Sequence, residues 1–128
     1  MKWLALALAL GGPAAAQEFA DAEGGSLRFL DKLTSETGDV TLNRGQSAKF
    51  GRLLVRLDSC RYPVANPSAD GEAYLTIVEE TTGLELFSGW MLASSPALSA
   101  LDHPRYDVWV LSCILPEAAV EPAPPANE

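Results

Sequence analysis

Residues 52–58, Arg-Leu-Leu-Val-Arg-Leu-Asp, contain the clearest strand pattern in this chain of 128 residues. Every second position is apolar, namely Leu53, Val55 and Leu57. Because the side chains of a β-strand point alternately to opposite faces, this pattern predicts a strand with one face in a hydrophobic core. The same period places Cys60 on the polar face. A bulge or a strand end near Ser59 is therefore needed to turn that cysteine inward.

Further segments on both sides of this strand are also expected to be strands, and the first two of them show the same alternation. They are residues 26–33, 39–43, 48–50, 73–78 and 84–92. Turn sequences at residues 34–38 and 79–83 end in glycine, which is expected to adopt the left-handed conformation in two hairpins. Leu27 and Phe29 are expected to face inward, and the next inward position falls on either Asp31 or Leu33.

Residues 106–115 differ because they are almost continuously apolar. This predicts a strand in the middle of a sheet, with both faces covered and Trp109 in the core. Before it, residues 94–96 (Ser-Ser-Pro) combine a helix N-cap with proline at the first helical position, which predicts a short helical turn carrying Leu98 and Leu101 on one face. The segments together predict an all-β fold: a small β-sandwich or partly open barrel of six or seven short strands with one short helical turn.

Both ends of the chain are expected to lie outside this β domain. Residues 1–16 contain Lys2, an apolar run and a small-residue cleavage site after Ala16, which together are typical of a secretory signal peptide. Residues 17–25 predict a flexible lead-in, and residues 116–128 form a proline-rich, acidic tail that cannot build a core. The β domain is therefore expected over residues 26–115, and the signal peptide predicts export to the periplasm.

The charge of the chain excludes some classes of partner. It has 17 acidic and 9 basic side chains and a net charge of -8 at pH 7. This charge repels nucleic-acid phosphates and anionic lipid head groups, so we expect neither to be a partner. The apolar run of the signal is shorter than the roughly 20 residues of a membrane-spanning helix, and no other stretch of the sequence approaches that length, so direct membrane insertion of the mature chain is not expected.

The chain has two cysteines, Cys60 and Cys113. In an exported protein, two cysteines far apart in sequence predict one structural disulfide. The Cys-x-x-Cys spacing that is typical of redox-active pairs is absent. We therefore expect the bond to join an early-middle strand to the last strand.

Three parts of the sequence resemble motifs of the family called domain of unknown function 2155 (DUF2155), exported proteins of alphaproteobacteria. The longest is residues 87–113, which begin Phe-Ser-Gly-Trp-Met-Leu and end Val-Trp-Val-Leu-Ser-Cys. The others are residues 30–32 (Leu-Asp-Lys) and the stretch from Phe-Gly-Arg-Leu at residues 50–53 to Cys-Arg-Tyr at residues 60–62. The resemblance covers residues 26–115. It implies an envelope location and a paired cysteine framework, and it implies no particular activity, substrate or partner.

One group of residues resembles a catalytic arrangement. Ser99 and His103 are four residues apart, with Asp102 beside them, as in a nucleophile and base pair. The sequence lacks the Gly-x-Ser-x-Gly elbow and a glycine-rich segment that would supply oxyanion donors. His103 before Pro104 is more typical of a helix end, where the ring binds backbone carbonyls.

Metal and carboxylate sites are also weakly indicated. Residues 66–72 match part of a calcium loop, but Ile77 occupies the position where glutamate is required. One histidine and two paired cysteines are too few ligands for zinc. The carboxylates of two loops, namely Asp70, Glu72, Glu79, Glu80 and Glu85, are expected to be solvated rather than paired for glycoside hydrolysis. We therefore expect no metal, no cofactor and no enzyme activity.

The remaining interpretation is a binding or structural module that docks on another envelope protein or complex. Trp90 follows a glycine near a strand end, so it is a better candidate than Trp109 for a partly exposed anchor, with packing of Trp90 in the core as the alternative. The expected partner-binding residues are Trp90, Ser94, Ser95, Pro96 and Arg105, and Arg61 is a further candidate for the polar rim. Two alternatives stay open: a small hydrolase or lyase acting on an envelope polymer, and a carrier of a small apolar ligand.

Overall fold

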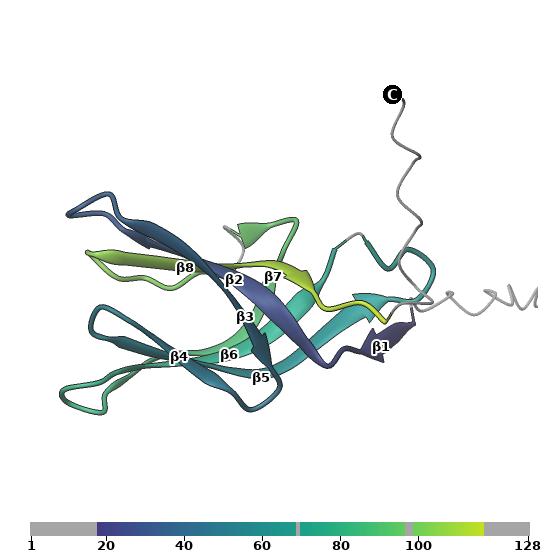
Figure 1. The fold of residues 1–128 in the computed structure, drawn as a ribbon, viewed down its shortest axis with the longest axis horizontal. Helices are drawn as coiled ribbons and strands as arrows, with labels where there is room; N and C mark the ends of the chain where they lie inside the picture. The colour runs from purple at the N-terminus through teal and green to yellow at the C-terminus, as the bar shows by residue number, and fades with distance from the viewer. Residues whose placement is uncertain (1–17, 69, 97–98, 117–128) are drawn as a thin grey trace, which may run out of the picture.

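The computed structural model describes residues 18–68, 70–96 and 99–116 and shows an all-β fold of eight strands in two antiparallel sheets. The strands are β1 (Phe19–Asp21), β2 (Gly24–Asp31), β3 (Thr37–Asn43), β4 (Ser47–Phe50), β5 (Leu53–Pro63), β6 (Glu72–Glu79), β7 (Glu85–Leu92) and β8 (Tyr106–Cys113). Figure 1 shows the two sheets as the layers of a sandwich. The predicted fold class is therefore confirmed.

The larger sheet has the strand order β1-β5-β6-β7, and β4 also pairs with β5. The smaller sheet has the order β3-β2-β8. Four pairs of strands that are consecutive in sequence form antiparallel neighbours: β2 with β3, β4 with β5, β5 with β6 and β6 with β7. The last strand instead returns beside β2. The smaller sheet is therefore completed only when the end of the β domain pairs with its beginning.

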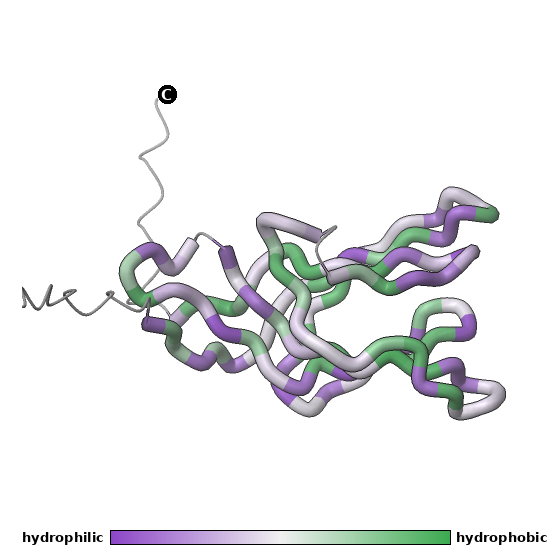
Figure 2. The backbone as a smooth tube through the Cα atoms, turned by 180° about the vertical axis from the view of Figure 1, so that it is seen from behind, coloured by the Kyte–Doolittle hydropathy of each residue, from purple (hydrophilic) through white to green (hydrophobic). Residues whose placement is uncertain are grey.

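Alternating side chains build the core between the two sheets, and polar and apolar segments alternate along the strands in Figure 2. Leu53, Val55 and Leu57 of β5 are completely buried, as their spacing predicted. The other sheet contributes Leu27 and Phe29 from β2. Further members of the same cluster are Leu42, Leu75, Ile77, Met91, Leu101, Val108 and Val110.

A disulfide joins the two layers. The register of β5 shifts between Leu57 and Ser59, and this irregularity turns Cys60 into the core. Cys60 is bonded to Cys113 at the end of β8, with the two Cα atoms 5.7 Å apart. A Cβ atom on Gly25 would lie 2.8 Å from the Cys60 sulfur, so β2 passes the bridge at a glycine. The predicted disulfide between Cys60 and Cys113 is confirmed. The predicted irregularity that turns Cys60 from the outer to the inner face of β5 is confirmed as well.

The segment expected to be a flexible lead-in contains β1 and the first residues of β2. Phe19, Ala20 and Asp21 pair with the end of β5. A strand of three residues is too short to show a period of two, and its partner lies far along the chain, so the local pattern could not predict it. The fold consequently has eight strands where the sequence indicated six or seven.

β8 lies at an edge of the smaller sheet and not in the middle of a sheet, as its apolar sequence had predicted. Val108 and Val110 are buried, whereas Trp109 and Leu111 are only partly buried on the other face. The placement of Trp109 in the core was therefore wrong. Its side chain borders a shallow, mainly apolar hollow together with Pro96, Ala100, Leu101, Asp107 and Val108.

The β2–β3 hairpin turns earlier than predicted. Ser35 has the left-handed backbone conformation, with φ of 63°, whereas Gly38 is already paired within β3. The Asp31 carboxylate accepts hydrogen bonds from the amides of residues 33–34, which holds the chain in this tight turn. In the β6–β7 hairpin the prediction is confirmed, because Gly83 has φ of 72°.

Some predictions fall outside the described residues. They include the signal peptide at residues 1–16 and the tail from residue 117 onward. The predicted helical turn between Pro96 and Pro104 lies only partly outside the described residues, because residues 97–98 are not described, whereas residues 99–103 are described and are not helical. Within residues 18–68, 70–96 and 99–116, no helix is long and apolar enough to cross a membrane.

Candidate functional site

Trp90 lies on the outer face of the larger sheet, in a cluster that crosses all four strands of its main path. It stands opposite Tyr74 of β6, and the two rings meet edge to face with their centroids 5.4 Å apart. The Arg61 guanidinium of β5 lies 4.2 Å from the centre of the Trp90 ring and 4.9 Å from the centre of the Phe19 ring of β1. We call these four side chains, together with Glu72, the Trp90 patch.

Arg61 is the central side chain of this patch. It stands opposite Glu72 in the β5–β6 ladder and donates a hydrogen bond of 2.7 Å from Nε to the carboxylate. The Glu72 side chain is 17% exposed, so this contact is partly shielded from water. A charge-assisted hydrogen bond and two cation–π contacts hold the guanidinium in one place. The Trp90 patch therefore carries balanced charge and has a defined geometry before any partner binds.

The Trp90 patch is also partly open to solvent. Each of its five side chains is of intermediate burial, and none of them belongs to the buried core cluster. Their burial follows from alternation, because Arg61, Tyr74 and Trp90 each stand next to a residue that points inward. The larger sheet therefore presents a band of aromatic and arginine side chains on its outer face.

The sequence motif at residues 50–53 has a different role, because it packs against buried Tyr106. The Phe50 ring stacks on Phe29 with centroids 4.9 Å apart and meets the Tyr106 ring edge-on at 5.9 Å. The Arg52 amide donates to the Tyr106 hydroxyl at 3.3 Å. Gly51, with φ of 55°, leaves the space that the Tyr106 ring fills. This motif is explained by the packing of the core.

The motif at residues 30–32 is explained by a buried ion pair. Asp31 is the one charged residue among the described residues that is classed as buried. Arg105, just before β8, donates to both of its carboxylate oxygens, with the shortest contact of 2.9 Å from Nη2. Lys32 adds a hydrogen bond of 2.7 Å to the carbonyl of His103. These contacts fasten the end of β2 to the start of β8.

The Arg105 guanidinium lowers the pKa of Asp31 to about 2, and the amides of residues 33–34 make a smaller contribution in the same direction. Burial of the carboxylate opposes this shift of the pKa. The carboxylate titrates near 3.8 when it is unperturbed. Because the pKa is lower in the folded protein, the stabilisation is fully present above about pH 4 and is lost as the pH falls toward 2. We expect Asp31→Asn to lower the melting temperature by several degrees at pH 7 and to flatten the loss of stability between pH 4 and pH 2.

Thermal unfolding followed by circular dichroism between pH 2 and pH 7 measures this effect. Asp39→Asn is the matched control, because Asp39 also pairs with an arginine, Arg28, but at the surface. Exposed ion pairs contribute little to stability, so this variant should stay close to the parent protein at neutral pH. Equal decreases of the melting temperature in the two variants would contradict a special role for the Asp31–Arg105 pair.

The structure separates the residues that were predicted to bind a partner. Trp90 lies on the larger sheet, whereas Arg105 is committed to Asp31 beside the smaller sheet and does not frame the indole. The Ser94 hydroxyl donates to Asp70, and Ser95 donates its amide to the carbonyl of Leu92, so this turn directly continues β7. Pro96 borders the hollow beside Trp109.

The region around His103 is not the helix end that the sequence indicated. Residues 99–105 contain no helical residue, and the His103 Nδ1 atom accepts hydrogen bonds from the amides of Arg105 and Tyr106 at 3.0 and 3.1 Å. The ring therefore caps the start of β8 instead of binding backbone carbonyls. In the described part of the chain no hydrogen bond joins Ser99 to His103, whose Nδ1 atom is bound by the two backbone amides.

The carboxylates considered for catalysis or metal binding are dispersed. Glu80 pairs with Lys49, and Glu79 accepts hydrogen bonds from the hydroxyls of residues 81–82. Glu72 is bound to Arg61. Among the described residues, no three His, Cys, Asp or Glu side chains are grouped in a way that could hold a metal ion.

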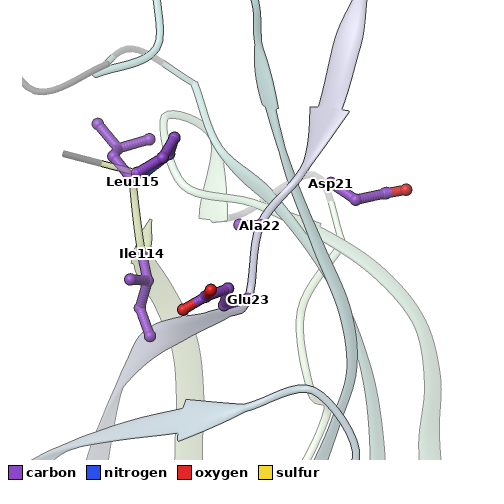
Figure 3. A pocket seen from close by; sticks show the side chains of 6 residues that line it. Asp21, Ala22, Glu23, Ile114 and Leu115 are labelled. Atoms are coloured by element: carbon purple, nitrogen blue, oxygen red, sulfur yellow. The ribbon is translucent and has the colours of Figure 1, made fainter. Parts of the chain in front are cut away.

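A surface hollow near the two ends of the described chain also contains two acidic residues. It is lined by Asp21, Ala22, Glu23, Ile114, Leu115 and Pro116. Figure 3 shows that Glu23 points toward Ile114, whereas Asp21 points away to the other side. The two carboxylates do not converge, so this hollow lacks the geometry of a two-carboxylate catalytic site.

Two members of the Trp90 patch escaped the sequence analysis. Phe19 lies in the segment that was interpreted as a flexible lead-in, and Tyr74 lies in a strand that was recognised only for its apolar side. The alternation in residues 72–75 does place Tyr74 opposite the buried positions, so this signal was present. Only the pairing of β1 with the end of β5 brings Phe19 to Arg61.

Comparison with known proteins places this chain in a family. The chain is 29% identical over 99 residues, covering 75% of its length, to "Uncharacterized protein RP359" of Rickettsia prowazekii (strain Madrid E), and the match covers 64% of that relative. No solved structure matches the chain significantly. The family model described as "Uncharacterized protein conserved in bacteria (DUF2155)" matches residues 25–113. That match spans most of the chain, and the protein therefore belongs to the DUF2155 family.

Proposed function

We propose that this protein is a non-catalytic module that is exported to the periplasm by residues 1–16 and docks on another envelope protein or complex through the Trp90 patch. The observation that carries the proposal is the contact of Arg61 with both Phe19 and Trp90 on an outer sheet face. Tryptophan, tyrosine and arginine are the residues that contribute most to binding at protein interfaces. Ser94 and Ser95 continue β7 and extend the same docking surface, whereas Pro96 borders the hollow beside Trp109 and is not part of it.

The motifs elsewhere in the chain support this choice by contrast. The motif at residues 50–53 is accounted for by packing around Tyr106, the motif at residues 30–32 by the ion pair with Arg105, and the cysteines by the disulfide. Trp90 has no comparable role in the core. Its position on a preorganised, partly open face favours binding over folding as its function.

We expect Trp90→Ala to weaken binding of the partner by at least about 2 kcal/mol, or roughly thirtyfold in Kd, because a central tryptophan anchor contributes that much. Photo-crosslinking in the native envelope, followed by mass spectrometry, identifies the partner. Titration calorimetry with the purified partner then gives the two dissociation constants. The stability of the variant should fall by only about 1 kcal/mol, because a single edge-to-face contact and a cation–π contact are lost.

Trp109→Ala is the matched control, because Trp109 is also a partly exposed tryptophan but lies on the outer face of the other sheet. It should leave the affinity for the partner unchanged. Collapse of the fold in Trp90→Ala would show that this side chain is structural. Unchanged binding in Trp90→Ala, together with loss of binding on substitution of Asp70 or Glu80, would place the docking surface elsewhere.

A further inference from the structure

β7 forms one edge of the larger sheet and has few of the features that usually protect an edge. Among the described residues, no backbone hydrogen bond joins residues 85–91 to any segment other than β6 and its own turn. The opposite edge is formed by β1, with three residues, and by β4, with four residues that include Lys49. Short strands and lysines are common means of preventing a further strand from pairing.

The sequence of β7 suits strand pairing. Residues 86–92 (Leu-Phe-Ser-Gly-Trp-Met-Leu) contain no charged residue and no proline. The one irregularity in its pairing with β6 lies near its beginning, and residues 87–92 pair without interruption. Unpaired amide and carbonyl groups along a regular, uncharged edge are a template for another extended chain. The same strand carries Trp90, so a chain added at this edge would meet the Trp90 patch.

The charge around β7 indicates what kind of chain would be added. Residues 62–104 contain no lysine or arginine, although they include six acidic residues: Asp70, Glu72, Glu79, Glu80, Glu85 and Asp102. Arg61 and Lys49 from neighbouring strands compensate two of these acids, Glu72 and Glu80. Glu85 lies at one end of β7, and Asp70 lies at the other end, held by Ser94. Neither forms an ion pair within the described part of the chain.

We propose that β7 accepts an extended segment of a partner protein as an additional strand, and that this segment has Lys or Arg at both ends and apolar residues between them. The proposal rests on the docking function and specifies how the partner engages it. An eight-residue strand is about 25 Å long, so seven or eight partner residues would span the distance between the two acidic ends. A second copy of this chain is a poorer occupant, because it would bring an equally acidic hairpin against the first.

The test uses an edge-blocked form of the full chain. Adjacent amides in a strand point to opposite edges, so either Ser88→Pro or Gly89→Pro removes an amide that faces the free edge. The proline variant that removes a free-edge amide should keep its hydrogen bonds to β6 and stay folded. The other proline variant removes an amide that bonds to β6, so it should be strongly destabilised. Thermal unfolding identifies the folded variant. Glu85→Lys provides a second test that leaves the backbone unchanged, with Glu36→Lys in the β2–β3 turn as its matched control.

Binding is measured by photo-crosslinking in the native envelope from p-benzoylphenylalanine at Tyr74, on the outer face, and at Leu84, beside the free edge. We expect the edge-blocked variant and Glu85→Lys to lower the yield of crosslinked partner from both positions by about tenfold or more. Glu36→Lys should leave this yield unchanged. The peptide crosslinked from Leu84 should come from an extended segment with basic ends.

The outcomes separate strand addition from docking itself. Full crosslinking from Tyr74 in the edge-blocked variant and in Glu85→Lys would overturn strand addition and leave the docking face intact. A crosslinked peptide from a helix, or from a second copy of this chain, would also overturn it. Absence of any protein crosslink from Tyr74 in the otherwise unaltered chain would contradict the docking function as well.

Discussion

We expect the double variant Cys60→Ala/Cys113→Ala to have a free energy of unfolding about 4 kcal/mol lower than that of the parent protein. This is the largest effect that we anticipate for any change in this chain. The bridge links residues 53 positions apart. In the chain-entropy model, closing a loop of this length restricts the unfolded state by about that amount. A small domain has only about 5 to 15 kcal/mol of stability in total, so the variant should keep about 1 to 11 kcal/mol and unfold at a lower urea concentration than the parent.

Urea unfolding of the parent and the double variant measures the difference, with the reduced parent protein as a control. Reduction and substitution should have similar effects, because both release the link between β5 and β8. Thiol labelling of the denatured, unreduced parent should detect no free sulfhydryl. A double variant whose free energy of unfolding lies within about 1 kcal/mol of the parent value, or labelling of both cysteines, would show that the bridge does not stabilise the protein.

Gly51→Ala is expected to cost about 2 to 4 kcal/mol of stability. Its φ of 55° lies in the left-handed region, which disfavours alanine by about 1 kcal/mol. The added Cβ atom would also overlap the hydroxyl of Tyr106 and lie 2.8 Å from its Cζ atom. Tyr106 is buried and contacts Phe50, so its ring cannot move without disturbing the core, and overpacking of this kind costs about 1 to 3 kcal/mol more.

Gly83→Ala separates the two causes. Gly83 has a similar backbone conformation, with φ of 72°, but an added Cβ atom would meet nothing within 4 Å. This variant should lose only about 1 kcal/mol, as expected from the backbone alone. Chemical denaturation of both variants, and of Gly51→Ala in a Tyr106→Leu background, tests the explanation. The contact with Tyr106 would be refuted if Gly51→Ala cost no more than Gly83→Ala, or if removing the tyrosine ring brought no relief.

Local sequence patterns were sufficient wherever one strand or one turn carried the information. The period of two in residues 53–57 predicted which side chains of β5 are buried. The same period showed that Cys60 can face the core only if the alternation of β5 is interrupted before it, and the structure has a register shift at that point. Gly83 and the extent of the β6–β7 hairpin were also predictable, because a turn depends mainly on its own residues.

Long-range pairing decided the features that the local patterns missed. Residues 106–115 were interpreted as a central strand from their apolar composition, but β8 is an edge strand because only β2 pairs with it. The buried state of Asp31 depends on Arg105, which is 74 positions away in the sequence. A carboxylate at an inward position is costly without such a partner, and nothing in the neighbouring residues reveals that the partner exists.

The two tryptophans on the sheets show the same division most clearly. The sequence determined that Trp90 and Trp109 both lie in strands, with each side chain pointing to one face. Their surroundings were decided by the tertiary structure: Trp109 faces outward from an edge strand, and Trp90 lies against Arg61, which also contacts Phe19 of β1. An indole has the same preference for burial in a core and in an interface, so its role depends on which distant strands are placed beside it.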